Sequence, residues 1–267
     1  MKHQLICCIR KDVKEYLRSR RNVLFCLTLL SLGIMVLGAT KLLPDLIRRL
    51  TETVSGVVTD PSSVSDTLLA FFPTDWQKNM GIFASDVAVF YGIVTVLSCY
   101  SLIVKEIQAG KWIFPLSAGY QPMTMIFSKG LVFGAGAAGP VVVFYMLYYF
   151  AGSTLLQGVY PLPNALIHGL TLGFAVFAMV YIAILLSAVC KRAIMAAVSV
   201  LMVVLAVPDI LTLFSFGKFF PTHLLTFVYT ASDAWEQLII PAAGTGLCCV
   251  VLTVIAAKKA AKIEVLR

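Results

Sequence analysis

Residues 82–104 read IFASDVAVFYGIVTVLSCYSLIV, an apolar run that carries a single charged residue, Asp86. A helix needs about 20 predominantly apolar residues to cross the hydrocarbon core of a bilayer, and this run is long enough. Lipid offers no hydrogen-bond partner to backbone groups, so a spanning segment of this kind must be helical. The stretch therefore predicts a transmembrane helix.

Five other segments pass the same test of length and apolar composition. They cover residues 22–43, 130–151, 165–189, 193–216 and 237–257. None shows the alternation of polar and apolar residues that a strand of a membrane β-barrel requires. We therefore predict an all-α integral membrane protein in which residues 1–267 form one membrane domain with six transmembrane helices.

The composition of the whole chain indicates the same class. Hydrophobic residues make up 60% of the 267 residues, charged residues make up 13%, and the mean hydropathy is +0.92. Soluble domains carry about 25% charged residues, so this chain lacks the polar side chains that would cover a water-soluble globule. The apolar content also excludes an intrinsically disordered chain.

The net charge of +8 is distributed unevenly among the segments that separate the spans. With the N-terminus placed inside, the inner segments hold sixteen Lys and Arg residues and the outer segments hold five. Positive residues favour the cytoplasmic side of a membrane, so we expect both termini to be cytoplasmic. The basic residues are spread over several segments instead of forming one stripe, which argues against a nucleic-acid partner.

Residues 5–21 precede the first span and combine apolar with basic side chains. The apolar ones are Ile6, Ile9, Val13 and Leu17. They recur at steps of three and four residues, which is the spacing of one helix face. The basic residues of the candidate interfacial face are Arg10, Lys14, Arg18 and Arg21. The pattern predicts an amphipathic helix that lies in the inner interface of the lipid bilayer. The alternative is a solvated charged tail that only sets the topology.

The longest predicted outer segment covers residues 44–81 and contains three prolines. Apolar residues between positions 46 and 54 indicate that a helix continues beyond the first span. The remainder, rich in Ser, Thr, Asp and Pro, is predicted as loop.

The fifth predicted span contains a break. Pro208 and Asp209 fall inside it, and Pro221 follows shortly after. Proline removes a helical hydrogen bond, and non-helical backbone at membrane depth must be covered by protein or water. We therefore predict a helix that breaks near the outer face, with Pro208, Asp209 and Pro221 as candidate outer-gate residues. The alternative is an ordinary proline kink followed by an aromatic-rich loop.

The sequence contains no recognisable catalytic or metal-binding pattern. It has no Gly-x-x-x-x-Gly-Lys-Ser/Thr motif for nucleotide phosphates, and its three histidines form no His-Glu-x-x-His site. The letters GAGAAG at 134–139 match a dinucleotide-binding fingerprint, but they lie inside an apolar span and favour close helix packing instead. Asp86 and Asp209 are the acids nearest the membrane, and we interpret both as solvated end positions or helix caps. We therefore expect no catalytic residue, metal or cofactor in this chain.

The segment 105–129 joins the second and third spans on the predicted cytoplasmic side. It is longer than a simple hairpin needs and contains an apolar cluster bordered by charged residues. Its candidate docking residues are Lys105, Glu106, Gly110, Lys111, Trp112, Phe114, Leu116 and Ser117. An apolar cluster at the base of a membrane domain is typical of a docking surface for a partner protein. A helix that lies on the lipid interface explains the pattern equally well.

This segment resembles the permease subunit of type-2 ABC transporters. That family shows a basic residue and Glu, Gly four residues after the Glu, an apolar run, a Ser or Thr, and a Lys that opens the third span. The residues that match in register are Lys105, Glu106, Gly110, Trp112, Phe114, Leu116, Ser117 and Lys129. The amphipathic segment, the six spans and the break near Pro221 extend the resemblance. The chain departs from the family at Lys111, where Thr is frequent, and at Gly119, where Pro is frequent; Pro115 interrupts the apolar run instead.

The resemblance implies a half-transporter of a bacterial cell membrane. Two such subunits would form an export pathway, and two separate ABC ATPase subunits would bind beneath them and carry ATP and Mg²⁺. Trp112 and Phe114 would be apolar anchors in the ATPase, and Glu106 and Lys111 would form the charged rim of that contact. The sequence does not specify the transported substrate.

Two other functional classes remain open. An ion-coupled secondary transporter or channel would use Asp86 or Asp209 as its coupling group, although the sequence shows no inverted repeat. A membrane scaffold or membrane enzyme that transports nothing is the third class, and the lack of a polar constellation within the spans disfavours it.

Overall fold

The computed structural model describes residues 2–54, 75–156, 158, 160–189, 194, 195, 198, 221–229 and 236–264. Almost all of these residues are helical, and no strand occurs among them. Five helical stretches are long and apolar enough to cross a membrane: Arg21–Leu42, Trp76–Gln108, Pro122–Leu155, Leu162–Val189 and Leu238–Lys259. The all-α class is thus confirmed, and the chain has the helices of a multi-pass membrane protein. The predicted fifth span at 193–216, with Pro208 and Asp209, lies almost entirely outside the described residues, so the count of six spans stays a prediction.

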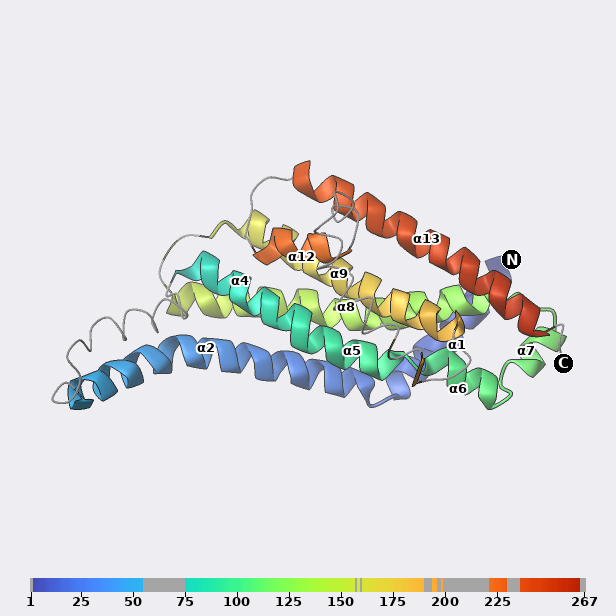
Figure 1. Cartoon of the computed structure of the whole chain (residues 1–267), viewed down its shortest axis with the longest axis horizontal. Helices are drawn as coiled ribbons and strands as arrows, with labels where there is room; N and C mark the ends of the chain where they lie inside the picture. Colours follow the sequence, from blue (N-terminus) through green and yellow to red (C-terminus); the bar gives the residue numbers. More distant parts are fainter. Residues whose placement is uncertain are drawn as a thin grey trace.

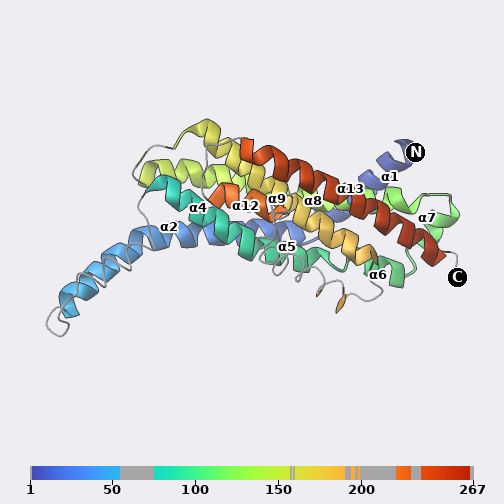
Figure 2. The same cartoon turned by 45° about the horizontal axis from the view of Figure 1, so that its top comes forward.

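The long helices run side by side in an elongated bundle (Figures 1 and 2). They are α2 (Arg21–Val54), α8 (Pro122–Leu155), α9 (Leu162–Val189), α13 (Glu236–Glu264) and the continuous series α4 (Trp76–Asp86), η1 (Val87–Tyr91) and α5 (Gly92–Cys99). α9 packs against α5, α8, α13 and the short helix α12 (Pro221–Tyr229). Because neighbours surround it, its apolar residues cover the whole circumference instead of one stripe.

Three shorter elements gather at one end of the bundle. These are α1 (Lys2–Arg18), α6 (Leu102–Gln108) and α7 (Ile113–Ser117), and the N-terminus and the end of α13 lie there too (Figures 1 and 2). This is the end that the charge distribution predicts to be cytoplasmic. Its orientation in a membrane stays a prediction.

The second and third spans begin earlier than predicted. α4 begins at Trp76 instead of 82, because the Asp75 carboxylate caps it by accepting the Gln77 backbone N–H at 3.2 Å. α8 begins at Pro122 instead of 130, with the proline in its first turn. The polar residues Ser128 and Lys129, which the predicted bounds place at the end of the connecting segment 105–129, are buried inside this helix against α1. The connection between α6 and α8 is therefore only 109–121, with α7 inside it. The end of α2 at Val54 agrees with the predicted helical continuation past the first span.

A π-helical turn, Val87–Tyr91, interrupts the second span, and the sequence analysis did not anticipate it. Tyr91 at its end is fully buried, and its hydroxyl donates to the Ala137 carbonyl of α8 at 2.7 Å. Asp86 directly precedes this turn and is half-buried. Single π-turns inside α-helices frequently occur at functional positions.

At the opposite end of the bundle, buried polar side chains connect α2, α4 and α8. The Asn79 amide donates to the Thr40 hydroxyl at 2.7 Å, and the Asn79 carbonyl accepts the Tyr148 hydroxyl. The Tyr148 ring stacks on Phe83 with a centroid distance of 4.0 Å. Polar groups within spanning helices need partners inside the protein because lipid provides none.

Candidate functional site

The first helix, α1, presents three different faces. Ile6 and Leu17 on its apolar edge are 64% and 65% exposed. The face that packs against the bundle consists of Cys8, Asp12 and Tyr16, all buried. The predicted basic residues Arg10, Lys14 and Arg18 are exposed on the remaining face. A helix with an exposed apolar edge and an exposed basic face therefore exists where the sequence predicts one. Its position in the membrane interface stays a prediction.

Tyr16 attaches α1 to α8. Its hydroxyl donates to the Gly136 carbonyl at 2.7 Å. Pro140 lies four residues further along α8 and has no N–H, so this carbonyl lacks its usual helical donor. A Cβ atom at Gly136 would clash with the Tyr16 ring, so a glycine is required for the close approach. Pro140 thus leaves the Gly136 carbonyl available to accept the Tyr16 hydroxyl of α1.

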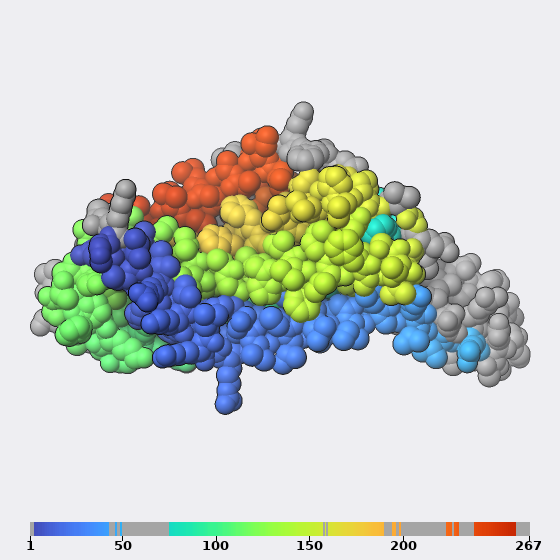
Figure 3. All heavy atoms as spheres, turned by 180° about the vertical axis from the view of Figure 1, so that it is seen from behind, coloured from blue at the N-terminus to red at the C-terminus, as the bar shows by residue number. Residues whose placement is uncertain are grey.

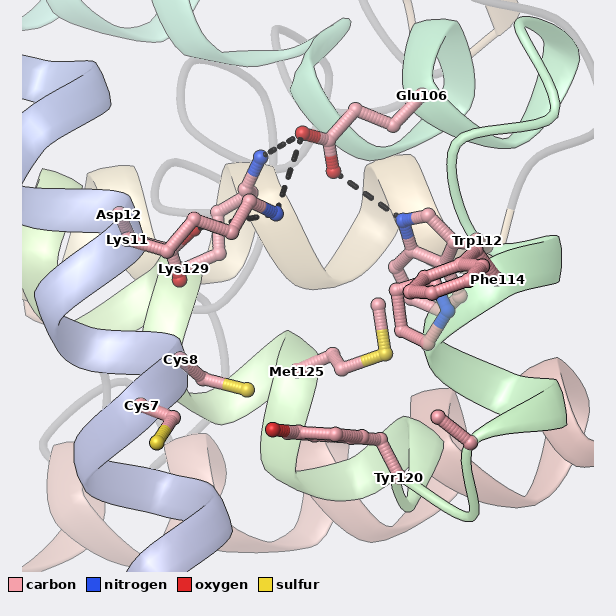
Figure 4. A pocket seen from close by; sticks show the side chains of 12 residues that line it. Cys7, Cys8, Lys11, Asp12, Glu106, Trp112, Phe114, Tyr120, Met125 and Lys129 are labelled. Carbon is pink, nitrogen blue, oxygen red and sulfur yellow. Dashed lines mark hydrogen bonds and ion pairs between the residues drawn. The ribbon is translucent and has the colours of Figure 1, made fainter.

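A partly buried ion cluster joins α1, α6 and α8, and Figure 4 shows all of its members except Glu15. It consists of Lys11, Asp12, Glu15, Glu106 and Lys129. Lys129 Nζ lies 2.5 Å from Glu106 Oε1 and 3.3 Å from Glu15 Oε2, and Lys11 Nζ lies 3.9 Å from the same Glu106 oxygen. Only 2% of Lys129 and 7% of Glu106 are exposed. Buried charges are tolerated when they are paired, so these contacts hold the three helices together.

Asp12 is the member of the ion cluster that has a buried carboxylate oxygen without a hydrogen bond. One carboxylate oxygen accepts the Ser128 hydroxyl at 2.6 Å. The other oxygen makes no hydrogen bond, although Lys11 Nζ lies 3.8 Å from it. Burial raises the pKa of the Asp12 carboxyl, while the Ser128 hydroxyl and the nearby Lys129 and Lys11 ammonium groups oppose the rise.

Trp112 belongs to the interior instead of the surface. Its indole N–H donates to Glu106 Oε2 at 3.1 Å, and it is only 7% exposed. The resemblance implied an exposed anchor at Trp112 and a rim charge at Glu106, but in this structure the two residues form an internal link between α6 and the start of α7. The difference arises because the Glu106 carboxylate faces Lys129 of α8 and Lys11 of α1. The Trp112 indole, which donates to this carboxylate, is therefore buried beside it.

The exposed apolar surface of the segment lies on α7 itself. Phe114 is 82% and Ile113 is 60% exposed. Lys111, which precedes them, is exposed as well. Ile113 was not among the predicted docking residues, although its apolar side chain next to Phe114 was a visible signal. Among the predicted docking residues, Glu106 and Trp112 are thus buried, while Lys111 and Phe114 are exposed.

The other predicted residues of the segment shape its backbone or lie at its edges. Gly110 has φ +68°, a left-handed conformation that glycine adopts without strain, and it leads the chain from α6 into α7. The Ser117 hydroxyl donates to the Phe114 carbonyl of its own helix at 2.9 Å. Lys105 is exposed, and Leu116 is half-buried against the core.

Two adjoining hollows lie beside these elements. The smaller, about 260 Å³, is enclosed by Cys8, Trp112, Tyr120 and Met125, with the ion cluster at its polar end (Figure 4). The larger, about 1100 Å³, separates the basic face of α1 from Phe114 and Pro115. Figure 3 shows α1 in dark blue against the green surface of the segment that contains α6 and α7.

The remaining predicted residues do not join this site. The Arg21 guanidinium lies 5.5 Å from the centre of the Phe133 ring, so this residue packs on an aromatic face instead of extending into solvent. Pro221 begins α12, away from the ion cluster. Pro208 and Asp209 lie outside the described residues, and so does any gate that they form.

No group of three or more His, Cys, Asp or Glu side chains suited to a metal ion occurs among the described residues. Comparison of the chain with models of known protein families and with curated proteins finds no match. Its function is therefore inferred from the ion cluster, the exposed helix α7 and the surrounding spans.

Proposed function

We propose that this chain is the membrane-spanning subunit of a type-2 ABC exporter in a bacterial cell membrane. Two copies would form the translocation pathway, and two separate ABC ATPase subunits would bind at the end where α1, α6 and α7 gather. The observation that carries the proposal is α7, a short helix that exposes 82% of Phe114 while its base is linked to the core.

The connection of α7 to the rest of the bundle supports a coupling role. Trp112 links the start of α7 to Glu106, and Glu106 pairs with Lys129 of α8. Lys129 in turn pairs with Glu15 of α1. Removing one partner of such a buried pair costs about 3–5 kcal/mol, so these helices should move together when α7 is displaced.

Such a connection meets the physical requirement of an ATP-driven transporter. The partner subunits would change between two states as they bind and hydrolyse ATP with Mg²⁺, and the permease must couple that equilibrium to its spans. This chain would contribute a contact surface and a rigid linkage, and no catalytic group. The sequence has no Gly-x-x-x-x-Gly-Lys-Ser/Thr motif for nucleotide phosphates, so the proposal assigns ATP binding to the partner subunits.

The test is co-purification of a tagged chain from its native membrane in mild detergent, with mass spectrometry of the bound proteins. We expect an ATPase with a nucleotide-binding motif at a one-to-one ratio. The double variant Ile113→Ala and Phe114→Ala should lose this ATPase while its membrane insertion and thermal stability are kept.

A matched control truncates one exposed Ile and one exposed Phe at positions outside α7. Ile239 on α13 and Phe150 on α8 are 68% and 55% exposed, and the variant Ile239→Ala and Phe150→Ala should keep the ATPase. Full retention of the ATPase by the Ile113 and Phe114 variant would contradict the docking role. If wild-type preparations that preserve a dimer contain no ATPase, the proposed function is wrong.

An ion-coupled secondary transporter or channel is the second candidate, and Asp86 is the observation that favours it. This carboxyl group is half-buried within the second candidate span and directly precedes η1. Ionisable groups inside spans are costly and frequently functional. Transport that continues on an ion gradient without ATP, and stops in the Asp86→Asn variant, would select this candidate over the exporter.

A further inference from the structure

The larger hollow, which we name the basic groove, carries an excess of positive charge. Its five cations are Arg10, Lys11, Lys14, Arg18 and Lys111, and its two acids are Glu15 and Glu106. Both acids already pair with Lys129, which does not line the groove. In the described part of the chain, no carboxylate lies within ion-pair distance of Arg10, Lys14, Arg18 or Lys111. Among the residues that the structure describes, these four cations therefore have no counterion.

The cations approach the groove from two walls. Arg10, Lys14 and Arg18 follow one another at four-residue steps along α1, so their Cα atoms span about 12 Å on one face of the helix. Lys111 comes from the opposite wall, at the start of the segment that carries α7. A phosphate group between the two walls would contact cations from both, which a flat basic surface does not allow.

The surroundings of the basic groove indicate the source of the phosphate. Ile6, Val13 and Leu17 are exposed on the neighbouring edge of α1. This helix packs against α8 and α2, two of the candidate spans. In the predicted orientation, its apolar edge would face the boundary between headgroups and acyl chains. Basic clusters next to spans attract anionic headgroups at the membrane surface. A soluble phosphate or an acidic protein segment gives no reason for the exposed apolar edge.

We propose that the basic groove binds the headgroup of an anionic phospholipid, with the lipid phosphate between Arg10, Lys14 and Arg18 on one side and Lys111 on the other. The acyl chains extend along the apolar edge of α1. The bound lipid supplies the missing counter-charge and fixes α1 beside α7. This site does not depend on the exporter proposal.

The experiment uses the full chain in detergent, titrated with phosphatidylglycerol or with phosphatidylcholine and observed by native mass spectrometry. The wild-type chain should retain phosphatidylglycerol preferentially. The triple variant Arg10→Gln, Lys14→Gln and Arg18→Gln should weaken that retention about a hundred-fold, since each lost cation near an anionic headgroup weakens binding about five-fold. Inorganic phosphate at millimolar concentration should not displace the lipid.

The control variant Arg20→Gln, Lys258→Gln and Lys259→Gln removes the same charge from exposed positions outside the groove. It should retain phosphatidylglycerol within about two-fold of the wild type. If both triple variants lose the lipid equally, general surface charge explains the binding and the proposed site is wrong. Displacement by inorganic phosphate would overturn the lipid as the source.

Lipid retention by a Lys111→Gln variant and ATPase co-purification by the triple variant test the site further. If the triple variant fails to fold, the single variant Lys111→Gln on the opposite wall should still weaken lipid retention about five-fold. If the triple variant keeps its lipid preference but loses a co-purifying ATPase, the groove binds an acidic protein segment and the lipid proposal fails. Loss of lipid with the ATPase retained supports the lipid site independently of the exporter proposal.

Discussion

The Tyr16 hydroxyl of α1 donates to the Gly136 carbonyl of α8 at 2.7 Å, in the turn where Pro140 leaves that carbonyl without a helical donor. This bond and the ion cluster hold α1 at two places along its length. The first helix is therefore a structural part of the bundle, although its sequence pattern is that of a peripheral amphipathic helix. Any motion of the spans that moves α8 must also move α1.

Removing this hydroxyl should destabilise the protein measurably. In the Tyr16→Phe variant the half-buried Gly136 carbonyl loses its donor. A fully buried acceptor left unpaired costs about 1–3 kcal/mol, so we expect a loss near the lower end of that range. We expect a lower midpoint of thermal unfolding in detergent. Tyr100→Phe is the matched control, because Tyr100 is half-exposed and its change should leave the midpoint unaltered. Equal midpoints for Tyr16→Phe and the wild type would contradict the anchoring role of Tyr16.

The buried pair between Glu106 and Lys129 predicts strong non-additivity. Lys129→Met leaves the Glu106 carboxylate without its closest partner, and Glu106→Gln removes the closest acceptor from Lys129. Each single variant should lose about 3–5 kcal/mol of unfolding free energy. The double variant should lose less than the sum of the two, because neither unpaired charge remains. Additive losses in a double-mutant cycle would show that the two groups do not interact.

Trp112 and Phe114 should respond differently to substitution. Trp112→Phe removes the N–H that donates to Glu106, a bond to a charged acceptor worth about 1.5–3 kcal/mol, so stability should fall. Phe114→Ala truncates a side chain that is 82% exposed, so stability should change by less than about 0.5 kcal/mol. Thermal unfolding of the two variants, measured beside ATPase co-purification, separates the internal residue from the surface residue. Similar destabilisation by both would contradict their assigned positions.

Asp12 predicts a specific dependence of stability on pH. Burial raises the pKa of its carboxyl above the unfolded value of 3.8, so the folded state binds the proton more tightly than the unfolded state. The resulting stabilisation is fully present below the unfolded pKa and is lost as the pH rises through the raised folded pKa. Relative to the Asp12→Asn variant, the wild-type chain should therefore gain stability as the pH is lowered from neutral. A difference between the two that is constant with pH, or that falls on acidification, would show that burial does not raise this pKa.

The all-α membrane class could be predicted from the sequence because it depends on local properties. Runs of about 20 apolar residues specify spanning helices whatever their neighbours are. The amphipathic pattern of residues 5–21 likewise repeats within a few turns of one helix, and α1 forms there. The apolar cluster near Phe114 was visible for the same reason, since it lies within one short stretch of chain.

The tertiary structure alone decided which of these residues are buried and with what they pair. Ser128 and Lys129 fall at the end of the predicted connecting segment 105–129, yet their partners Asp12 and Glu15 are more than 100 residues away along the chain. Those partners make it possible to bury the charge of Lys129 inside α8 and to begin that helix at Pro122. Lys129 also pairs with Glu106, which accepts the indole N–H of the buried Trp112. Hydrophobic periodicity shows which residues leave water, but the pairing of buried charges depends on helices that meet only when the chain is folded.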